Sequence, residues 1–124
     1  MTILKGIYGA MCTPFQDSGE GIDIKRYHSH IDDLLEAGVH GLVLCSGTGE
    51  YAYLTDDEKQ TLIIEGVKHI NGRCPTIAQT TALSTNECIN KARAAEDAGA
   101  TAIMVMPPFL EPPSERGIIY HYEA

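Results

Sequence analysis

The sequence has 124 residues, of which 44% are hydrophobic and 21% are charged, a balance typical of a globular domain that can bury its own core. The formal net charge of −8 disfavours nucleic acid as a partner, because an acidic surface repels phosphate backbones. No apolar run approaches the ~20 residues that cross a bilayer, and the N-terminal stretch MTILKGIYGAMCTPF lacks the basic segment of a signal peptide, so we expect a cytoplasmic protein without a membrane contact.

The first elements along the chain are a strand, a helix and a second strand. Residues 6–15 form a short, nearly continuous apolar run that predicts a strand. Residues 24–37 carry Tyr27, Ile31 and Leu34 at helical spacing and stop at Gly38, which favours a helix with a glycine stop. Residues 41–47 form a second apolar run. Both runs lack the alternation of a half-exposed strand, so we expect parallel strands buried on both faces.

Three helices and two strands are predicted in the rest of the chain. A capping-box sequence begins the second helix at Thr55, and Asn71–Gly72 ends it. A strand over 75–81 follows, then a helix over 84–99 that opens with a second capping box, then a strand over 101–108. The last helix is predicted to begin near Ser114, and no stop signal follows it before Ala124.

The order of elements, βαβαβαβα, predicts a parallel α/β sheet with right-handed crossovers in a single domain over 1–124. The segments EAGVHGLVL (36–44) and DAGATAIMV (97–105) resemble one another, which favours an array of equivalent βα units. This pattern alone leaves two architectures open, namely an open doubly wound sheet and one half of an eight-stranded barrel.

The corner after the second strand is the most distinctive polar segment. Ser46-Gly47-Thr48-Gly49-Glu50 lies where the carboxyl end of a parallel strand is expected, and ligands bind at such ends in both architectures. Its glycines allow a ligand to approach backbone N–H groups, and two hydroxyls lie beside them. The segment therefore predicts an anion or carboxylate site, with a tight strand-to-helix turn as the alternative. It matches neither a dinucleotide-binding fingerprint nor a P-loop.

Cysteine and histidine give no indication of a metal site. The four cysteines are far apart and show no C-x-x-C spacing, so we expect reduced thiols that are mostly buried. His28 and His30 would point away from one another on a helix, and we expect both to be solvated on the surface. We therefore expect no metal and no cofactor.

Several segments together resemble the N-terminal half of the dihydrodipicolinate synthase and N-acetylneuraminate lyase family. The matching stretches are CTPF…GIDI (12–15 and 21–24), AGVHGLVLCSGTGEYAYLTDDEK (37–59), the run from 75 to 108, and PPSERGIIYHY (112–122). The resemblance implies an α/β fold, the first four βα units of a (β/α)₈ TIM barrel. It also implies a homo-oligomeric class I aldolase or lyase that acts on pyruvate or a related 2-oxo acid through a Schiff base with a lysine.

The resemblance also assigns expected roles to particular residues. Gly47 and Thr48 match the loop that binds the substrate carboxylate, although Gly47 stands where the synthase has a hydroxyl. MPPF (106–109) matches a segment in which the synthase has two successive tyrosines, so Phe109 brings no phenol. The GTGE loop together with PPF looks more like the branch that dehydrates 5-dehydro-4-deoxyglucarate, or like another, less-studied member of the family. We expect Glu50 to orient the loop by accepting backbone N–H groups.

The resemblance places the Schiff-base lysine and the principal catalytic tyrosine beyond Ala124, so we expect no catalytic residue in this sequence. Lys5 precedes the first strand, and the other lysines fall on helical segments where solvated side chains are expected, namely Lys25, Lys59, Lys68 and Lys91. We expect an N-terminal fragment that is inactive alone. The alternative is a non-catalytic half-barrel that binds a small carboxylate or pairs with a partner chain, such as a second half-barrel.

Overall fold

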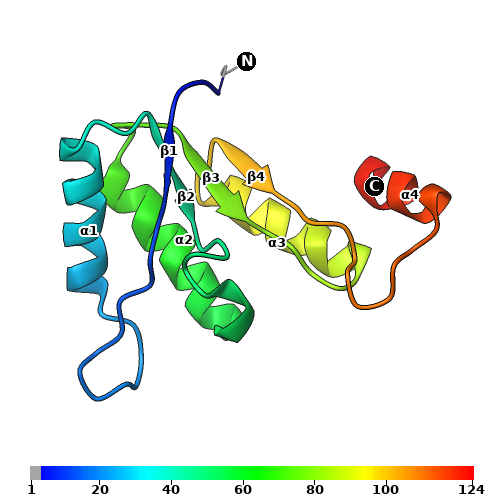
Figure 1. Ribbon diagram of the computed structural model, residues 1–124, viewed down its shortest axis with the longest axis horizontal. Coiled ribbons are helices and arrows are strands. Elements are labelled where there is room, and N and C mark those ends of the chain that lie inside the picture. Colours follow the sequence, from blue (N-terminus) through cyan, green and yellow to red (C-terminus); the bar gives the residue numbers. More distant parts are fainter. Residues whose placement is uncertain (1–3) are drawn as a thin grey trace.

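The computed structural model describes residues 4–124 and shows four βα units in succession (Figure 1). The strands are β1 (Tyr8–Ala10), β2 (Gly41–Leu44), β3 (Thr76–Gln79) and β4 (Ala102–Met104). The helices are α1 (Ile24–Glu36), α2 (Asp56–Ile70), α3 (Thr85–Asp97) and α4 (Glu115–Glu123), with a 3₁₀ helix η1 (Tyr51–Tyr53) before α2.

The sheet is parallel throughout, and its strand order is β1-β2-β3-β4. Each new strand is therefore added beside the one before it, on the same edge of the sheet. A doubly wound sheet reverses direction at a switch point, and no reversal occurs among the strands of residues 4–124. Consecutive helices also contact one another, α1 with α2 and α2 with α3, and Figure 1 shows them following one another along the sheet. This is the arrangement of a barrel wall.

The helices begin where the sequence places their caps. The side chain of Asp23 accepts a hydrogen bond from Arg26 N at the start of α1. Thr55 and Glu58 form a complete capping box at the start of α2, in which each side chain bonds the backbone N–H of the other residue. Ser84 and Ser114 cap α3 and α4 through their hydroxyls. These caps fix the points at which the strand-end loops stop and the helices begin.

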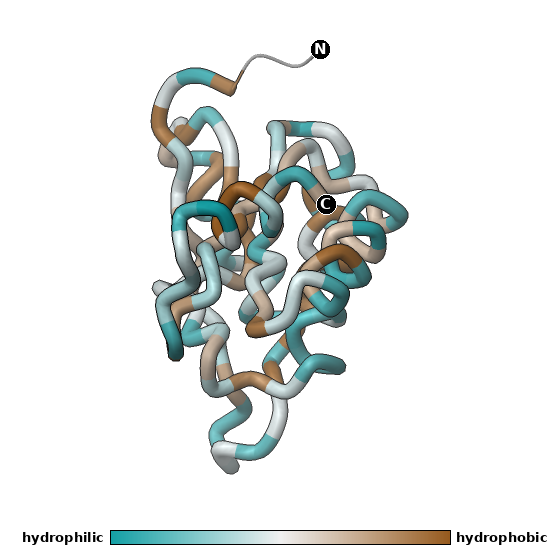
Figure 2. The backbone as a smooth tube through the Cα atoms, turned by 90° about the vertical axis from the view of Figure 1, so that its right-hand side faces the viewer, coloured by the Kyte–Doolittle hydropathy of each residue, from teal (hydrophilic) through white to brown (hydrophobic). Residues whose placement is uncertain are grey.

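The core lies between the sheet and the first helices. Leu42 and Leu44 of β2 are fully buried, as are Ile31 of α1 and Leu62 of α2. The two Leu44 methyl groups lie against Gly66 of α2, which lets the helix approach the strand closely. Figure 2 shows that the hydrophobic stretches lie mostly inside the fold and that the outer turns are hydrophilic. Parallel strands that are covered by helices carry such apolar residues.

Two features differ from what the sequence predicts. All four strands are shorter than their apolar runs, because the ends of those runs turn into the loops that follow. Only β2 is buried at every position, since β1 and β4 are the edges of the sheet and are partly exposed. The last helix, α4, lies beyond β4 and away from α1 and α2 (Figure 1).

Among residues 4–124, no helix is long and apolar enough to span a membrane.

Candidate carboxylate-binding site

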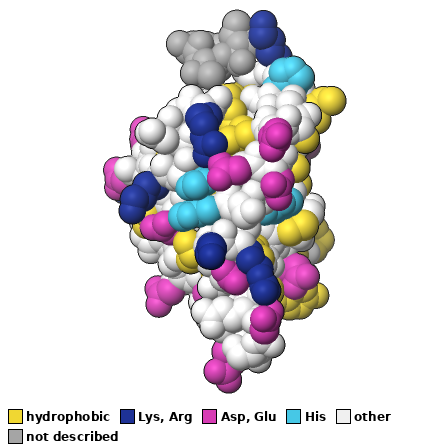
Figure 3. All heavy atoms as spheres, turned by 90° about the vertical axis from the view of Figure 1, so that its left-hand side faces the viewer, with side chains coloured by type: hydrophobic (Ala, Val, Ile, Leu, Met, Phe, Trp, Pro, Cys, Tyr) yellow, Lys and Arg dark blue, Asp and Glu magenta, His cyan; other side chains and the backbone are white. Residues whose placement is uncertain are grey.

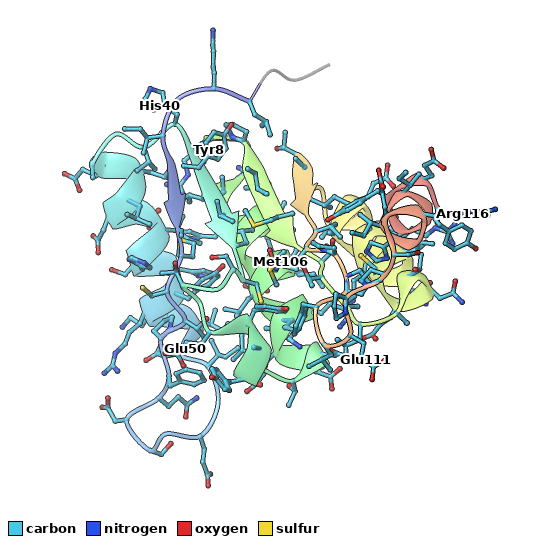
Figure 4. The ribbon with its side chains drawn as sticks, turned by 45° about the vertical axis from the view of Figure 1, so that its right-hand side comes forward. Tyr8, His40, Glu50, Met106, Glu111 and Arg116 are labelled. Atoms are coloured by element: carbon cyan, nitrogen blue, oxygen red, sulfur yellow. The ribbon has the colours of Figure 1, made fainter. Side chains whose placement is uncertain are left out.

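The loops that follow the strands all lie at the carboxyl-terminal end of the sheet, because all four strands run in the same direction. Two hydrogen bonds tie neighbouring loops together. The Thr13 hydroxyl, after β1, donates to the carbonyl oxygen of Gly49, after β2, at 2.7 Å. Met106 N, after β4, donates to the hydroxyl oxygen of Thr81, after β3, at 2.9 Å. Figure 4 shows Glu50 and Met106 on this side of the molecule.

The loop over 46–50 turns sharply and is held by its own backbone. Glu50 N donates to Gly47 O at 3.0 Å, and Tyr51 N donates to Ser46 O at 3.3 Å. Cys45 and Glu50, which flank the turn, both have left-handed backbone conformations, with φ of 55° and 60°. Such conformations are uncommon for residues other than glycine and cluster at functional sites.

The turn leaves three consecutive backbone donors free. Within residues 4–124, the N–H groups of Gly47, Thr48 and Gly49 donate to no backbone or side-chain acceptor. Gly47 and Thr48 are exposed, and the Thr48 hydroxyl has no hydrogen bond in this part of the chain. Successive N–H groups in a turn form a concavity that suits an anion. The loop can therefore bind a carboxylate through its backbone, with the Thr48 hydroxyl as a further donor.

The two glycines of this loop differ in what surrounds them. A Cβ at Gly49 would lie 2.9 Å from the carbonyl oxygen of Met11 and 3.2 Å from the hydroxyl of Thr13, so only glycine fits. A Cβ at Gly47 would meet no atom within 4 Å, and its backbone is not in the left-handed region. The turn therefore requires glycine at Gly49, whereas Gly47 leaves open space in front of the loop.

The structure shows how exposed the side chains of Glu50 and Phe109 are. The carboxylate of Glu50 is exposed and caps no N–H group of η1, so its left-handed backbone, and not its side chain, shapes the turn. Phe109 lies in the segment after β4 and is 54% exposed. The role of each side chain stays a prediction.

Three buried polar groups lie near the carboxyl ends of the strands, and the sequence analysis singled out only one of them, the Ser46 hydroxyl. The hydroxyls of Ser46 and Thr80, and the Oε1 atom of Gln79, are buried without a hydrogen-bond partner in the described chain. Buried polar atoms are rarely left unpaired, so these three are available to a ligand or a water molecule. Two of them belong to the end of β3 and the residue after it, in the segment IAQTTALST. Polar residues at the end of an apolar run are the sequence feature from which these groups could have been predicted.

The lysines of the described chain are unsuited to forming a Schiff base. Lys5, Lys25 and Lys68 are exposed. Lys59 and Lys91 are less exposed than expected, and both pair with Asp56, at 3.2 and 3.0 Å. Burial lowers the pKa of Lys91, but its hydrogen bonds to Glu87 and Asp56 outweigh that effect and raise the pKa. A nucleophilic lysine needs the opposite shift.

The described residues also hold no group of three or more His, Cys, Asp or Glu side chains that could bind a metal ion. The four cysteines are free thiols, two of them buried, one partly buried and Cys12 exposed.

The fold and the loop together define a class of protein: an α/β barrel protein, represented by its first four βα units, with a turn of free backbone N–H donors among its strand-end loops. The sequence profile of the Dihydrodipicolinate synthetase family matches residues 3–124. The chain belongs to this family.

Two similar proteins support this assignment. The chain is 39% identical to a 4-hydroxy-tetrahydrodipicolinate synthase of Methanoculleus marisnigri, over 97% of this chain and 42% of that protein. A synthase of the same name from Bacillus subtilis is 38% identical, over 93% of this chain and 39% of that protein. The chain thus spans about two fifths of the length of these relatives.

Solved structures agree with the fold of the chain. A prophage protein of the dihydrodipicolinic acid synthase family from E. coli K12, in complex with pyruvate, superimposes with a TM-score of 0.93 at 30% identity, over 98% of this chain and 41% of that one. A dihydrodipicolinate synthase from Acinetobacter baumannii, also complexed with pyruvate, gives 0.93 at 33% identity, over 98% and 41%. The four parallel βα units match the N-terminal part of the family's TIM barrel.

Proposed function

We propose that this chain supplies the carboxylate-binding part of a Schiff-base lyase that acts on pyruvate or a related 2-oxo acid. The observation that carries the proposal is the turn at Gly47, Thr48 and Gly49, whose three N–H groups are free within the described chain and lie at the carboxyl ends of the strands. A carboxylate that accepts several backbone N–H groups is held firmly and in one orientation. Two similar structures of the family contain pyruvate, which has such a carboxylate.

The chemical step then needs a lysine from outside residues 4–124. In a Schiff-base mechanism the lysine amine attacks the 2-oxo carbon and water leaves, so the enzyme holds the substrate as a covalent imine. The loop's part in this scheme is to fix the carboxylate and thereby present the neighbouring carbonyl to the amine. The hydroxyls of Ser46 and Thr80, unpaired within the described chain, lie at the same edge and support a polar ligand there.

Borohydride trapping tests whether the lysine that forms the Schiff base lies outside this chain. We expect that sodium borohydride and pyruvate add no mass to this chain alone, because Lys91 is held protonated by its ion pairs and Lys5, Lys25 and Lys68 are solvated. Intact-mass spectrometry measures the adduct. A stable pyruvate adduct on any lysine of this chain would overturn the proposal.

A positive arm of the same experiment uses the remainder of a relative. The part of the Bacillus subtilis synthase that follows the matched region is co-expressed with this chain, and the purified pair is treated in the same way. We expect the adduct on the added part, together with pyruvate-dependent protection of the pair against unfolding. An adduct that forms equally well with the added part alone would show that this chain contributes nothing to the site.

Within the family, we propose the branch that dehydrates 5-dehydro-4-deoxyglucarate. Two residues support this branch: Gly47 leaves open space where the synthase has a hydroxyl, and Phe109 brings no phenol to the segment after β4. The relatives described above are named synthases, so the substrate must be tested directly. The reconstituted pair is expected to dehydrate 5-dehydro-4-deoxyglucarate faster than it forms 4-hydroxy-tetrahydrodipicolinate. The reverse order of rates, measured by product chromatography, would assign the synthase activity instead.

We propose further that another barrel part covers the open edges of the sheet, either from a longer chain or as a second half-barrel in an oligomer. Ile103 and Met104 of β4 are 46% and 39% exposed, and Tyr120 of α4 is 70% exposed. Unpaired strand edges with apolar side chains tend to pair with another chain. A chain that binds pyruvate but gains no activity from such a partner would favour the alternative function, a non-catalytic carboxylate-binding half-barrel.

A further inference from the structure

A threonine side chain joins the ends of β3 and β4. Thr81 is 4% exposed, and its hydroxyl oxygen accepts hydrogen bonds from Met106 N at 2.9 Å and from Nε2 of Gln79 at 2.8 Å. The backbone bond nearest to this point runs from Thr80 N to Met104 O, at 3.0 Å. A regular parallel ladder would continue with a bond from Met106 N to Thr80 O, but Met106 N bonds to Thr81 instead. The Thr81 side chain therefore takes over where the backbone pairing stops.

The 106–109 segment, which reads MPPF, has few other ties to the rest of the fold. Proline has no N–H, so Met106 N is the last backbone donor before Phe109. Within residues 4–124, no hydrogen bond besides the one to Thr81 involves the 106–109 segment. Figure 4 shows Met106 beside the strands and Glu111 on the loop that follows. The position of the segment relative to β3 therefore depends on the Thr81 hydroxyl.

The opposite end of the same strand pair is closed in a similar way. The Thr101 hydroxyl, just before β4, accepts a hydrogen bond from Thr76 N, at the start of β3, at 3.0 Å. Thr101 N donates in turn to the Thr76 hydroxyl at 3.3 Å. Because both strands begin here, this contact lies at the other end of the sheet from the strand-end loops. Thr101 is thus a threonine that joins the same two strands away from the candidate site.

The width of β3 separates the 106–109 segment from the turn at Gly47–Gly49. Neighbouring strands lie ~4.8 Å apart, so the loops after β2 and β4 are roughly 10 Å apart across the sheet. Pyruvate, with three carbons, is too short to bridge this distance from a carboxylate held in the turn. A 2-oxo acid of six carbons is long enough to approach the segment. The segment is therefore placed to contact a part of the substrate that pyruvate lacks.

We propose that Thr81 is a positioning residue for the part of the substrate that lies beyond the pyruvate unit. By binding Met106 N, Thr81 fixes the 106–109 segment beside β3, and the segment contacts the distal carbons of a longer 2-oxo acid. Thr81 itself binds neither the carboxylate nor the 2-oxo group. The inference rests on the proposed function, because it takes the turn at Gly47–Gly49 as the site of the carboxylate.

Borohydride trapping with two acids of different length tests this role. The chain, reconstituted with the remainder of the Bacillus subtilis synthase, is titrated with pyruvate and with 2-oxoadipate, a six-carbon 2-oxo acid, and intact-mass spectrometry measures the adduct. Thr81→Val keeps the shape of the side chain but removes the acceptor, so the half-saturating concentration of 2-oxoadipate is expected to rise about tenfold. That of pyruvate is expected to stay within about twofold of the parent's. Thr81→Ser keeps the hydroxyl and is expected to bind both acids as the parent does.

Thr101→Val is the matched control and is expected to leave both titrations unchanged, because Thr101 joins β3 and β4 at the far end. If Thr81→Val weakens the binding of the two acids equally, or of neither, the proposal is overturned. The same holds if the parent pair traps pyruvate but not 2-oxoadipate. A parent pair that traps neither acid would contradict the proposed function of the turn, and the inference with it.

Amide hydrogen exchange on the chain alone tests the hydrogen bond without a ligand. In the parent, Met106 N–H is expected to exchange more slowly than Leu110 N–H, which has no acceptor in the described chain. Thr81→Val is expected to remove this protection from Met106, whereas Thr101→Val is expected to remove protection from Thr76. If Met106 N–H exchanges as fast as Leu110 N–H in the parent, the proposal is wrong, whether or not the valine variant folds.

Discussion

Replacing Leu44 by alanine is expected to lower the free energy of unfolding by about 3 to 4 kcal/mol, the largest stability effect that we expect of a single substitution in this chain. Leu44 is fully buried in β2, and its two methyl groups lie against Gly66 of α2, which has no side chain of its own to fill the space. The substitution therefore removes buried apolar surface and leaves a cavity between the central strand and the helix. Urea unfolding followed by circular dichroism measures the change.

Leu110→Ala is the matched control, because it is the same chemical change at a leucine that is 70% exposed. Its effect is expected to stay within about 0.5 kcal/mol. Similar losses in both variants would show that Leu44 is not at the centre of the packing between β2 and α2. A loss in Leu110→Ala alone would show that the segment after β4 is buried in solution, as it would be if another barrel part or a second copy covered it.

Replacing Gly49 by alanine is expected to cost roughly a hundredfold in kcat/KM, measured on the chain reconstituted with the remainder of a relative. The new Cβ would lie 2.9 Å from the Met11 carbonyl oxygen, and backbone cannot give way as a flexible side chain can. The loop must shift, which breaks the 2.7 Å hydrogen bond from Thr13 and turns the N–H groups of Gly47 and Thr48 away from the carboxylate. Trapping with borohydride should fall in parallel.

Gly47→Ala is the control at the same loop. Its Cβ would meet no atom within 4 Å, so the backbone keeps its shape and the activity is expected to change by less than about threefold. Equal losses in the two variants would mean that the space in front of Gly47, and not the orientation of the N–H groups, is what the substrate needs. An unaffected Gly49→Ala variant would remove the loop from the site.

The sequence was sufficient for most of the architecture because its signals are local. The capping residues Thr55, Ser84 and Ser114 start their helices in the structure as predicted, since a cap depends on only a few neighbouring residues. The residue pattern alone leaves strand order open, because hydrophobic periodicity shows which face of an element is buried but not its neighbour in space. The pairing of β4 with β3, and not with β1, decided in favour of the barrel, because a doubly wound sheet would reverse at this point.

The candidate site was predicted in part. The sequence indicated the Ser46–Glu50 loop, because glycines and hydroxyls directly after an apolar run are typical of a ligand-binding turn. It carries no information on which glycine is sterically required, since that depends on Met11 and Thr13, which are far away in the sequence. The stack of the His28 ring on the His69 ring, with centroids 4.1 Å apart, was missed for the same reason: periodicity compares residues of one helix, and these two come from α1 and α2. Both side chains are only about a quarter exposed, at 28% and 27%, so His28 is not the solvated histidine that the sequence predicts. Figure 3, which looks onto this side, shows histidines gathered among acidic and basic side chains.

The strand order also has a consequence for the way in which the chain is made. Pairing joins Gly9 to Leu42 and Leu42 to Thr76, so each strand waits only for the next βα unit before it can pair. Domains emerge from the ribosome N-terminus first, so each strand is synthesised after its neighbour on one side and before its neighbour on the other. The order in which synthesis delivers the strands is the order in which they lie in the sheet. A barrel wall of this kind can therefore grow unit by unit on a nascent chain, and the residues that shape the turn at Gly49, namely Met11 and Thr13, are already synthesised when the turn emerges.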